Sequence, residues 1–210
     1  MNALSERLSG EPNNGEYFTI GIDGRGGAGK STLARWLAGH ALEGFAVSAA
    51  DAYYEPVEDE LVPGTFNMER FMRDVGSSVT DGKRSLSYRP YTWPGRPVAP
   101  AREIEVEGGL IHEGVKTFAL PIDWDVTIWV DSPRSLCLDR YLSRPYSERK
   151  SDFSQEQLEV AGREYARQAD LHVADLDPLN NADIVVSGTR SFEEQLEDTL
   201  SVSKEFVQTA

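Results

Sequence analysis

Residues 21–32 have the sequence Gly-Ile-Asp-Gly-Arg-Gly-Gly-Ala-Gly-Lys-Ser-Thr. The residues just before this stretch are apolar enough to form a short buried strand, and residues 31–38 are typical of a helix. Four positions between them match the spacing G-x-x-x-x-G-K-S of a phosphate-binding P-loop: Gly24, Gly29, Lys30 and Ser31. Because a chance match rarely falls between a strand and a helix, this stretch predicts a nucleoside triphosphate site.

The residue types of this stretch suit an anion. Glycines allow positive φ values, so the backbone N–H groups can turn inward around a phosphate. The following helix directs its N-terminal dipole at the same place. Lys30 is expected to reach the β- and γ-phosphates, and the Ser31 hydroxyl is expected to bind Mg²⁺. The predicted nucleotide-binding residues are Gly24, Arg25, Gly26, Gly27, Ala28, Gly29, Lys30, Ser31 and Thr32.

The composition is that of one globular domain. The chain has 210 residues, of which 40% are hydrophobic and 27% are charged, enough for a sizeable core. A net charge of −14 argues against a nucleic-acid or anionic-membrane binder, because both need a cationic face. One segment, 134–150, is locally cationic through Arg134, Arg140, Arg144, Arg149 and Lys150. This segment is either a phosphate clamp or a solvated helix face.

Cysteine and histidine usage argues against further classes of site. The single cysteine, Cys137, rules out an intrachain disulfide and a multi-thiolate zinc site. The histidines, His40, His112 and His172, are scattered, so we expect them to have surface or packing roles and not to form a metal site. No apolar signal segment opens the chain and no stretch approaches the length of a membrane span, which predicts a cytoplasmic protein.

Apolar runs and turn residues divide the chain into alternating strands and helices. Further strands are expected at 45–50, 103–107, 126–131 and 182–187, and helices at 30–43, 66–79, 134–144, 154–170 and 191–207. The connecting segments are expected to be a loose leader or short helix at 1–16, an exposed loop at 55–65, and a structured loop or irregular hairpin in the proline-rich segment 84–101. Strands alternating with helices predict a parallel sheet covered on both faces.

The carboxyl ends of these strands are the expected place for a site, because ligands of parallel α/β sheets bind beyond that edge. Three acidic residues each close a predicted strand there: Asp51, Glu107 and Asp131. A carboxylate at this edge can accept a hydroxyl proton, and arginine side chains can bind phosphate oxygens. We therefore expect these residues around the phosphates.

Five further motifs follow the P-loop in order: Ala50-Asp51-Ala52-Tyr53-Tyr54, Tyr88-x-x-Tyr91-x-Trp93, Val106-Glu107-Gly108, Val130-Asp131 before an arginine-containing helix, and Pro178 ahead of residues 182–186. Together they resemble the uridine kinase-like branch of P-loop small-molecule kinases, which is related to pantothenate kinase and phosphoribulokinase. The resemblance implies an α/β protein with the three-layer α/β/α P-loop NTPase fold, a five-stranded parallel sheet of order 2-3-1-4-5 and a small lid at about 141–155. It makes 17–210 a single kinase domain after a flexible leader, 1–16.

The resemblance also implies an activity, the transfer of the γ-phosphoryl group of ATP to a small-molecule hydroxyl with Mg²⁺ as cofactor. By position, Asp51 would orient the acceptor hydroxyl as a base, and Glu107 would hold the hydration shell of the Mg²⁺ bound by Ser31. The implied catalytic residues are Asp51, Lys30, Arg140 and Arg144, with both arginines in or beside the lid. The implied acceptor-binding residues are Asp51, Tyr53, Tyr54, Asn67, Tyr91, Trp93 and Glu107.

Each of these roles has a structural alternative. Asp51 could cap the chain as it leaves its strand, and the aromatic residues could belong to the core or the surface. Glu107 could be a strand-end carboxylate satisfied by backbone groups. The two arginines could form surface pairs with Asp139 or Glu148.

The resemblance favours a nucleoside of the uridine or cytidine kind as the acceptor. Nucleoside-accepting relatives often carry an aspartate after the Asp-x-Tyr-Tyr loop, whereas this chain offers Asn67, or Glu69 in a shifted register. A vitamin precursor or a sugar-like alcohol therefore stays open as acceptor, as does a homo-oligomeric state. The alternative from another class is a nucleotide switch or ATPase module without a small acceptor. The N-K-x-D motif of GTPases and the Ser-Gly-Gly-Gln signature of transporter ATPases are both absent from the sequence.

Overall fold

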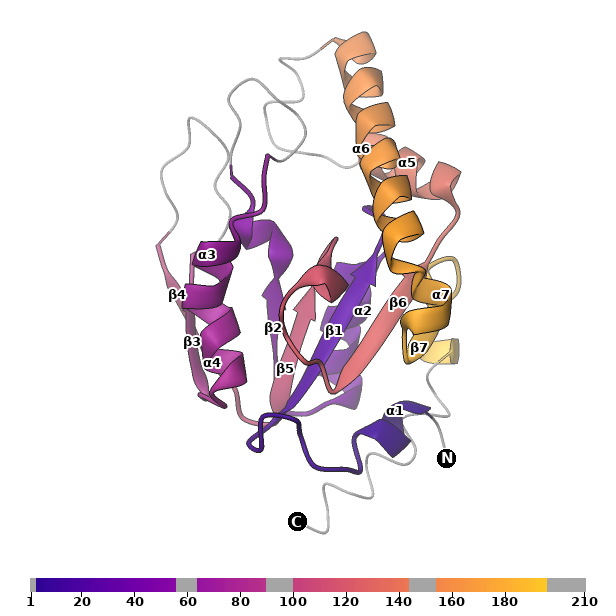
Figure 1. Cartoon of the computed structure of the whole chain (residues 1–210). Coiled ribbons are helices and arrows are strands. Elements are labelled where there is room, and N and C mark those ends of the chain that lie inside the picture. Colours follow the sequence, from indigo (N-terminus) through magenta and orange to yellow (C-terminus); the bar gives the residue numbers. More distant parts are fainter. Residues whose placement is uncertain (1–2, 56–63, 90–99, 144–153, 196–210) are drawn as a thin grey trace.

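The computed structural model describes residues 3–55, 64–89, 100–143 and 154–195. Its centre is a five-stranded sheet, ordered β2-β5-β1-β6-β7, in which every neighbouring pair is parallel (Figure 1). The strands are β1 (Phe18–Gly24), β2 (Phe45–Ala49), β5 (Gly109–Glu113), β6 (Val126–Asp131) and β7 (Ile184–Ser187). Numbered among themselves along the chain, these strands have the order 2-3-1-4-5, which confirms the predicted topology.

One predicted strand does not belong to this sheet. Residues of the segment 103–107 form β4 (Arg102–Glu105), which pairs antiparallel with β3 (Ser85–Tyr88) in a separate two-stranded sheet. The third parallel strand is β5, so the assignment of 103–107 to the main sheet was wrong. The physical reason is burial: three of the four residues of β4 are exposed and Ile104 is half-buried, whereas every residue of β5 is buried between β1 and β2. The hairpin expected within 84–101 begins at β3.

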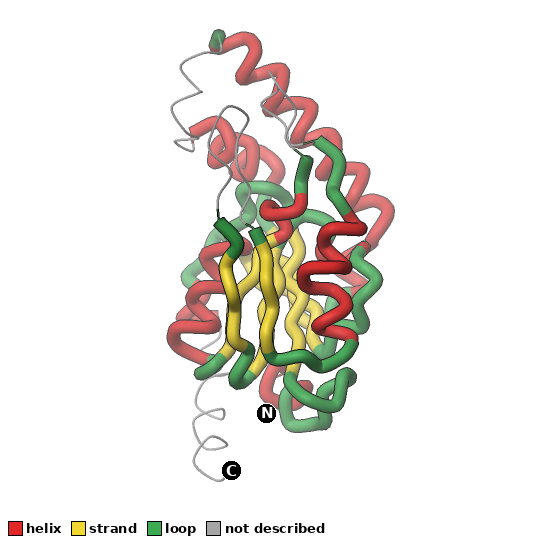
Figure 2. Tube along the Cα trace, turned by 90° about the vertical axis from the view of Figure 1, so that its left-hand side faces the viewer, coloured by secondary structure: helices red, strands yellow, loops and turns green. Residues whose placement is uncertain are grey.

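The helices flank the strands on both sides (Figure 2). Helix α2 (Lys30–Trp36) continues as a π-helical turn, η1 (Leu37–Ala41). The other helical segments are α1 (Ala3–Arg7), η2 (Ala50–Tyr53), α3 (Met68–Phe71), η3 (Met72–Gly76), α4 (Ser77–Thr80), η4 (Thr117–Ala119), α5 (Arg134–Ser143), α6 (Gln155–Leu176) and α7 (Pro178–Asn181). The longest, α6, has 22 residues, begins with a capping box between Ser154 and Gln157, and lies beside α5 (Figure 1).

Two hydrophobic clusters cover the two faces of the sheet. One joins the sheet to α2 and to Leu4 of α1, and the other joins it to the α3–α4 segment and the β3–β4 hairpin. Strand β5 shows the alternation directly, because Leu110 packs in the second cluster and Ile111 in the first. No helix in the described part of the chain is long and apolar enough to cross a membrane. This packing leaves the carboxyl edge of the sheet to the loops that carry the site.

Candidate active site

The P-loop connects β1 to α2 with the backbone geometry that the glycines predict. Gly27 and Gly29 have φ values of 85° and 112°, which favour glycine. A Cβ atom on Gly27 would lie 2.5 Å from the carbonyl oxygen of Cys137, so α5 also packs too closely for a side chain. The Lys30 side chain is 8% exposed, and its Nζ donates to the carbonyl oxygens of Gly24 and Arg25, both at 3.0 Å. The loop is therefore preshaped, with its lysine folded back along it.

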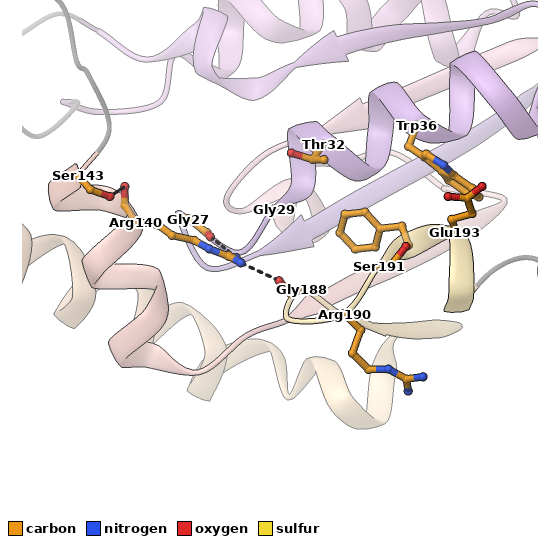
Figure 3. Close-up of a pocket in the computed structure, with 11 residues that line it drawn as sticks. Gly27, Gly29, Thr32, Trp36, Arg140, Ser143, Gly188, Arg190, Ser191 and Glu193 are labelled. Atoms are coloured by element: carbon orange, nitrogen blue, oxygen red, sulfur yellow. Dashed lines mark hydrogen bonds between the residues drawn. The ribbon is translucent and has the colours of Figure 1, made fainter.

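Arg140 of α5 braces this loop from outside. Its Nη1 donates to the carbonyl oxygens of Gly27 (3.1 Å) and Ala28 (3.4 Å), and its Nη2 donates to that of Gly188 (3.1 Å), as Figure 3 shows for Gly27 and Gly188. The guanidinium thus joins the P-loop to the turn that follows β7. The sequence predicted Arg140 at the phosphates, and the structure places it against the loop that would bind them. Arg144, with Arg149, Lys150 and most of the expected lid, lies outside the described residues.

A cavity of about 750 Å³ opens on this side of the P-loop. Its walls come from the loop, from α2 and from the segment after β7, and Trp36 and Phe192 supply aromatic faces. Arg190 also lines it, although its guanidinium points away from Gly29 and Thr32 (Figure 3). Aromatic faces beside a phosphate loop suit a purine base. The sequence carried no readable signal for this pocket, because it is assembled from segments about 150 residues apart.

Glu113, not Glu107, is the carboxylate that faces the P-loop. Glu113 closes β5 at the carboxyl edge of the sheet and is 7% exposed. Burial raises the pKa of Glu113, while the charge of Lys30 and the nearby Ser31 side chain act in the opposite direction. Glu107 precedes β5, is exposed, and lies at the amino edge, where its carbonyl oxygen accepts from Arg84 at 2.6 Å. The metal and acceptor roles given to Glu107 are therefore corrected.

The oxygen ligands at this point fit Mg²⁺. A hydroxyl and a carboxylate, Ser31 and Glu113, are hard ligands, and Mg²⁺ in nucleotide sites needs only one or two protein groups beside phosphates and water. The described residues contain no cluster of three or more His, Cys, Asp or Glu side chains that could hold a metal by itself. This donor set suits a metal that arrives with a nucleotide.

A second cavity, of about 620 Å³, opens next to Asp51. Asp51 lies in η2 directly after β2 and is exposed. Tyr54 lines the same cavity and donates from its hydroxyl to the carbonyl oxygen of Val115 at 3.3 Å. Burial, followed by the charges of Asp51 and Asp23, raises the pKa of Tyr54, so its hydroxyl stays protonated. The far wall is formed by α6, through Glu164, Tyr165, Gln168 and Ala169.

The other residues predicted to bind the acceptor have different places. Tyr53 is fully buried in the second hydrophobic cluster, edge-on to Phe71 at 5.4 Å between ring centroids, which is the core alternative for this residue. Asn67 caps α3 by accepting from the Arg70 N–H at 2.8 Å, and its amide donates to Glu55. Tyr91 and Trp93 lie outside the described residues. Of the predicted pocket residues that the structure describes, Asp51 and Tyr54 are the two that line this cavity.

Comparisons with solved structures identify the architecture. A candidate fructose transport system kinase from Silicibacter sp. TM1040 superposes with a TM-score of 0.64 at 20% identity, over 88% of this chain and 95% of that one. A possible uridine kinase from Bacillus stearothermophilus gives 0.55 at 16% identity, over 88% and 99%. A D-glycerate 3-kinase from Cryptococcus neoformans var. grubii gives 0.57 at 12% identity, over 90% and 93%. The chain has the fold of P-loop small-molecule kinases. No protein-family model and no curated protein sequence matches it.

Within this P-loop kinase fold, α6 contacts the phosphate loop at points that the sequence analysis missed. A Cβ atom on Gly26 would lie 1.8 Å from the hydroxyl oxygen of Tyr165, so the loop and the helix are in direct contact there. Arg25 forms an ion pair with Asp170 of α6, which also accepts from Nε of Arg134 at 2.8 Å. The predicted nucleotide-binding residue Arg25 is thus engaged by α6. Nothing local in the sequence could have revealed contacts across about 145 residues.

Proposed function

We propose that this chain is an ATP- and Mg²⁺-dependent kinase that phosphorylates a hydroxyl group of a small molecule. The observation that carries the proposal is a pair of cavities near one P-loop: Gly27 and Gly29 line the first, and the second is lined by Tyr165, which abuts Gly26. One has aromatic walls beside Gly29, and the other contains the exposed carboxylate of Asp51. A nucleotide held by the loop would place its terminal phosphate between them. A kinase needs this geometry because its main task is to position an oxygen in line with the phosphorus.

The residues have distinct tasks in this proposal. The P-loop amides and Lys30 hold the triphosphate, and Ser31 and Glu113 hold Mg²⁺, which supplies charge neutralisation at the phosphates. Asp51 accepts the proton of the acceptor hydroxyl as the oxygen forms its bond to the γ-phosphorus. The bond from that phosphorus to the β–γ bridging oxygen breaks, ADP leaves, and Asp51 returns the proton to solvent.

The acceptor class follows from what surrounds Asp51. The resemblance to uridine kinases favours a nucleoside, with Asn67 expected to hold ribose hydroxyls. The side-chain oxygen of Asn67 instead accepts a hydrogen bond from the Arg70 N–H, and its amide nitrogen donates one to Glu55. Asn67 does not line the cavity. A non-nucleoside alcohol is therefore the acceptor that these contacts support better.

The test is acceptor-dependent release of ADP from Mg-ATP, measured across nucleosides, pantothenate-like alcohols and sugars. We expect Asp51→Asn to lower transfer to the accepted alcohol by about 100-fold or more, as loss of a positioned base does. Asp81→Asn is the matched control, because Asp81 is an exposed carboxylate that pairs with Lys83 and lines neither cavity. A nucleotide switch or ATPase would release ADP at the same rate without any alcohol, and that result would refute the kinase.

A further inference from the structure

Asp23 is a fully buried carboxylate at the base of the P-loop that the proposed chemistry does not use. It is 0% exposed and is the last side chain of β1 before Gly24. A buried carboxylate is costly unless hydrogen bonds satisfy it. The hydrogen-bond partners of Asp23 therefore indicate its role.

Three separate parts of the site meet at this carboxylate. Oδ1 accepts from the N–H of Gly24, the first glycine of the P-loop, at 2.6 Å. Oδ2 accepts from the N–H of Phe118 at 3.0 Å, in the segment 115–120 that forms one wall of the Asp51 cavity. Nε2 of His172, on α6, lies 3.1 Å from Oδ2 and 3.3 Å from Oδ1.

His172 connects the two cavity walls to each other. It is 7% exposed, and its Nε2 also lies 3.1 Å from the backbone nitrogen of Lys116. With a proton on Nε2 the ring donates to Asp23, and without one it accepts from the Lys116 N–H. Lys116 has a φ of 70°, a left-handed conformation that a non-glycine residue keeps only where its surroundings hold it. Both tautomers of His172 thus connect α6 to this point, one through Asp23 and the other through Lys116.

We propose that Asp23 and His172 are positioning residues that fix both walls of the acceptor cavity to the P-loop. The inference rests on the proposed kinase function. One wall is the segment 115–120, bound through Phe118 and Lys116, and the other is α6, bound through His172. The pair sets the distance between the acceptor hydroxyl and the phosphate that the loop holds. A displacement of about 1 Å in such geometry can cost 100-fold in rate.

Asp23 and His172 have different hydrogen-bond partners, so substitutions at the two positions are expected to have different kinetic effects. Asp23 binds the P-loop amide as well as the walls, so Asp23→Asn is expected to weaken both Mg-ATP binding and acceptor use. His172 contacts the walls and Asp23 but no P-loop group among the described residues. His172→Ala is therefore expected to lower kcat/KM for the acceptor about tenfold while the Kd of Mg-ATP stays within twofold.

The experiment compares His172→Ala with His172→Gln and with Leu171→Ala. Gln keeps an N–H near the position of Nε2 and should restore most of the acceptor kcat/KM. Leu171 is the neighbouring residue, is 49% exposed and should leave kcat/KM unchanged. The ratio of phosphorylated acceptor to ADP released is expected to fall below one in His172→Ala, because misplaced walls admit water. Amide hydrogen exchange should accelerate at Lys116 and Phe118 in this variant.

Each outcome decides the proposal. Equal loss of Mg-ATP affinity and acceptor use in His172→Ala, or a lowered melting temperature with unchanged kcat/KM, product ratio and exchange, would overturn it. Failure of Gln to restore what Ala removes would also count against it. A failure of the kinase proposal itself would appear already in the unmodified protein, as ADP release that needs no acceptor.

Discussion

Strand β5 is bracketed by two Glu-Gly pairs, Glu107-Gly108 before it and Glu113-Gly114 at its end, and the two have opposite surroundings. Glu113 is buried against Lys30 and Ser31, whereas Glu107 is exposed. A Cβ on Gly114 would lie 2.2 Å from that of Ala50, next to the turn that carries Asp51, so this glycine lets the site close up. The two Glu-Gly pairs therefore have different roles because they lie at opposite edges of the sheet.

Substituting each of these two glutamates tests this difference directly, and Glu113 is expected to give the larger effect. Glu113→Gln should lower kcat/KM for phosphoryl transfer by about 10- to 100-fold, because loss of a group that orients a metal typically costs that much. Glu107→Gln is the matched control and should change kcat/KM by less than about twofold, since the side chain is exposed at the opposite edge. Initial rates over a Mg²⁺ titration at saturating ATP would measure both.

The Mg²⁺ dependence of the activity loss tests whether Glu113 acts through the metal. The deficit of Glu113→Gln should shrink as Mg²⁺ rises, because the carboxylate helps to hold the metal. If Glu107→Gln lost as much activity as Glu113→Gln, the carboxyl edge would not be the metal edge. The correction made from the structure would then fail.

The fold was predictable because its strongest signals are local. The P-loop spacing marks one strand, one helix and the edge of the sheet where ligands bind, and Asp51 follows from the same rule. The sequence 103–107 was mistaken for a central strand because its β-type run ends at the turn residues Gly108-Gly109. The alternation of Glu and apolar residues there indicates a half-exposed strand, while Gly109–Glu113 has the unbroken burial of a central one. A strand placed at 109–113 puts Glu113, and not Glu107, at the carboxyl edge.

The rest of the site had no local signal. Asp23 and His172 are 149 positions apart, and Trp36 and Phe192 line one cavity although they are far apart in the sequence. Single histidines and aromatic residues are most often packing residues, and His112 confirms that expectation. Contacts of this kind depend on how α6 and the segment after β7 pack beside the P-loop, which residue spacing alone does not encode.

The amino edge of the sheet is expected to govern stability and not catalysis. There the Asp125 carboxylate accepts from the Thr19 N–H (2.7 Å), the Thr19 hydroxyl (2.8 Å) and the Asn13 N–H (2.5 Å). Asp125→Ala should lower the free energy of unfolding by about 1–3 kcal/mol, because it leaves these donors without their acceptor. Urea denaturation would measure the loss, and kcat/KM at a temperature where the variant is folded should be unchanged. A fall in kcat/KM of tenfold or more would contradict this division between the two edges.

His112 gives a smaller, pH-dependent effect within β5 itself. Burial lowers the pKa of His112 to about 3, and its ring stacks on Trp124 with Nδ1 bonded to the Ser48 hydroxyl at 2.8 Å. In the unfolded chain the His112 ring binds a proton near pH 6.5, whereas in the folded protein it stays neutral at that pH. Stability therefore falls as the pH drops below 6.5. We expect a contribution of about 2 kcal/mol between pH 6.5 and 5.0. His112→Gln should remove this slope, as urea midpoints at both pH values would show, whatever its stability at neutral pH.

Glu113, the next residue, should act on stability with the opposite sign. Because burial raises its folded pKa above that of the unfolded chain, the folded state binds more protons in the interval between the two values. Stability therefore decreases as the pH rises through that interval, and the loss is complete above the folded pKa. Glu113→Gln should accordingly raise the urea midpoint at pH 7.5 relative to the unmodified protein, with a smaller gain at pH 4.5, in the absence of nucleotide. Glu107→Gln should raise it at neither pH. A metal-positioning role implies a carboxylate that lowers stability in the absence of ligand and yet is needed for turnover. If Glu113→Gln were no more stable than the unmodified protein at pH 7.5, Glu113 would not meet this condition.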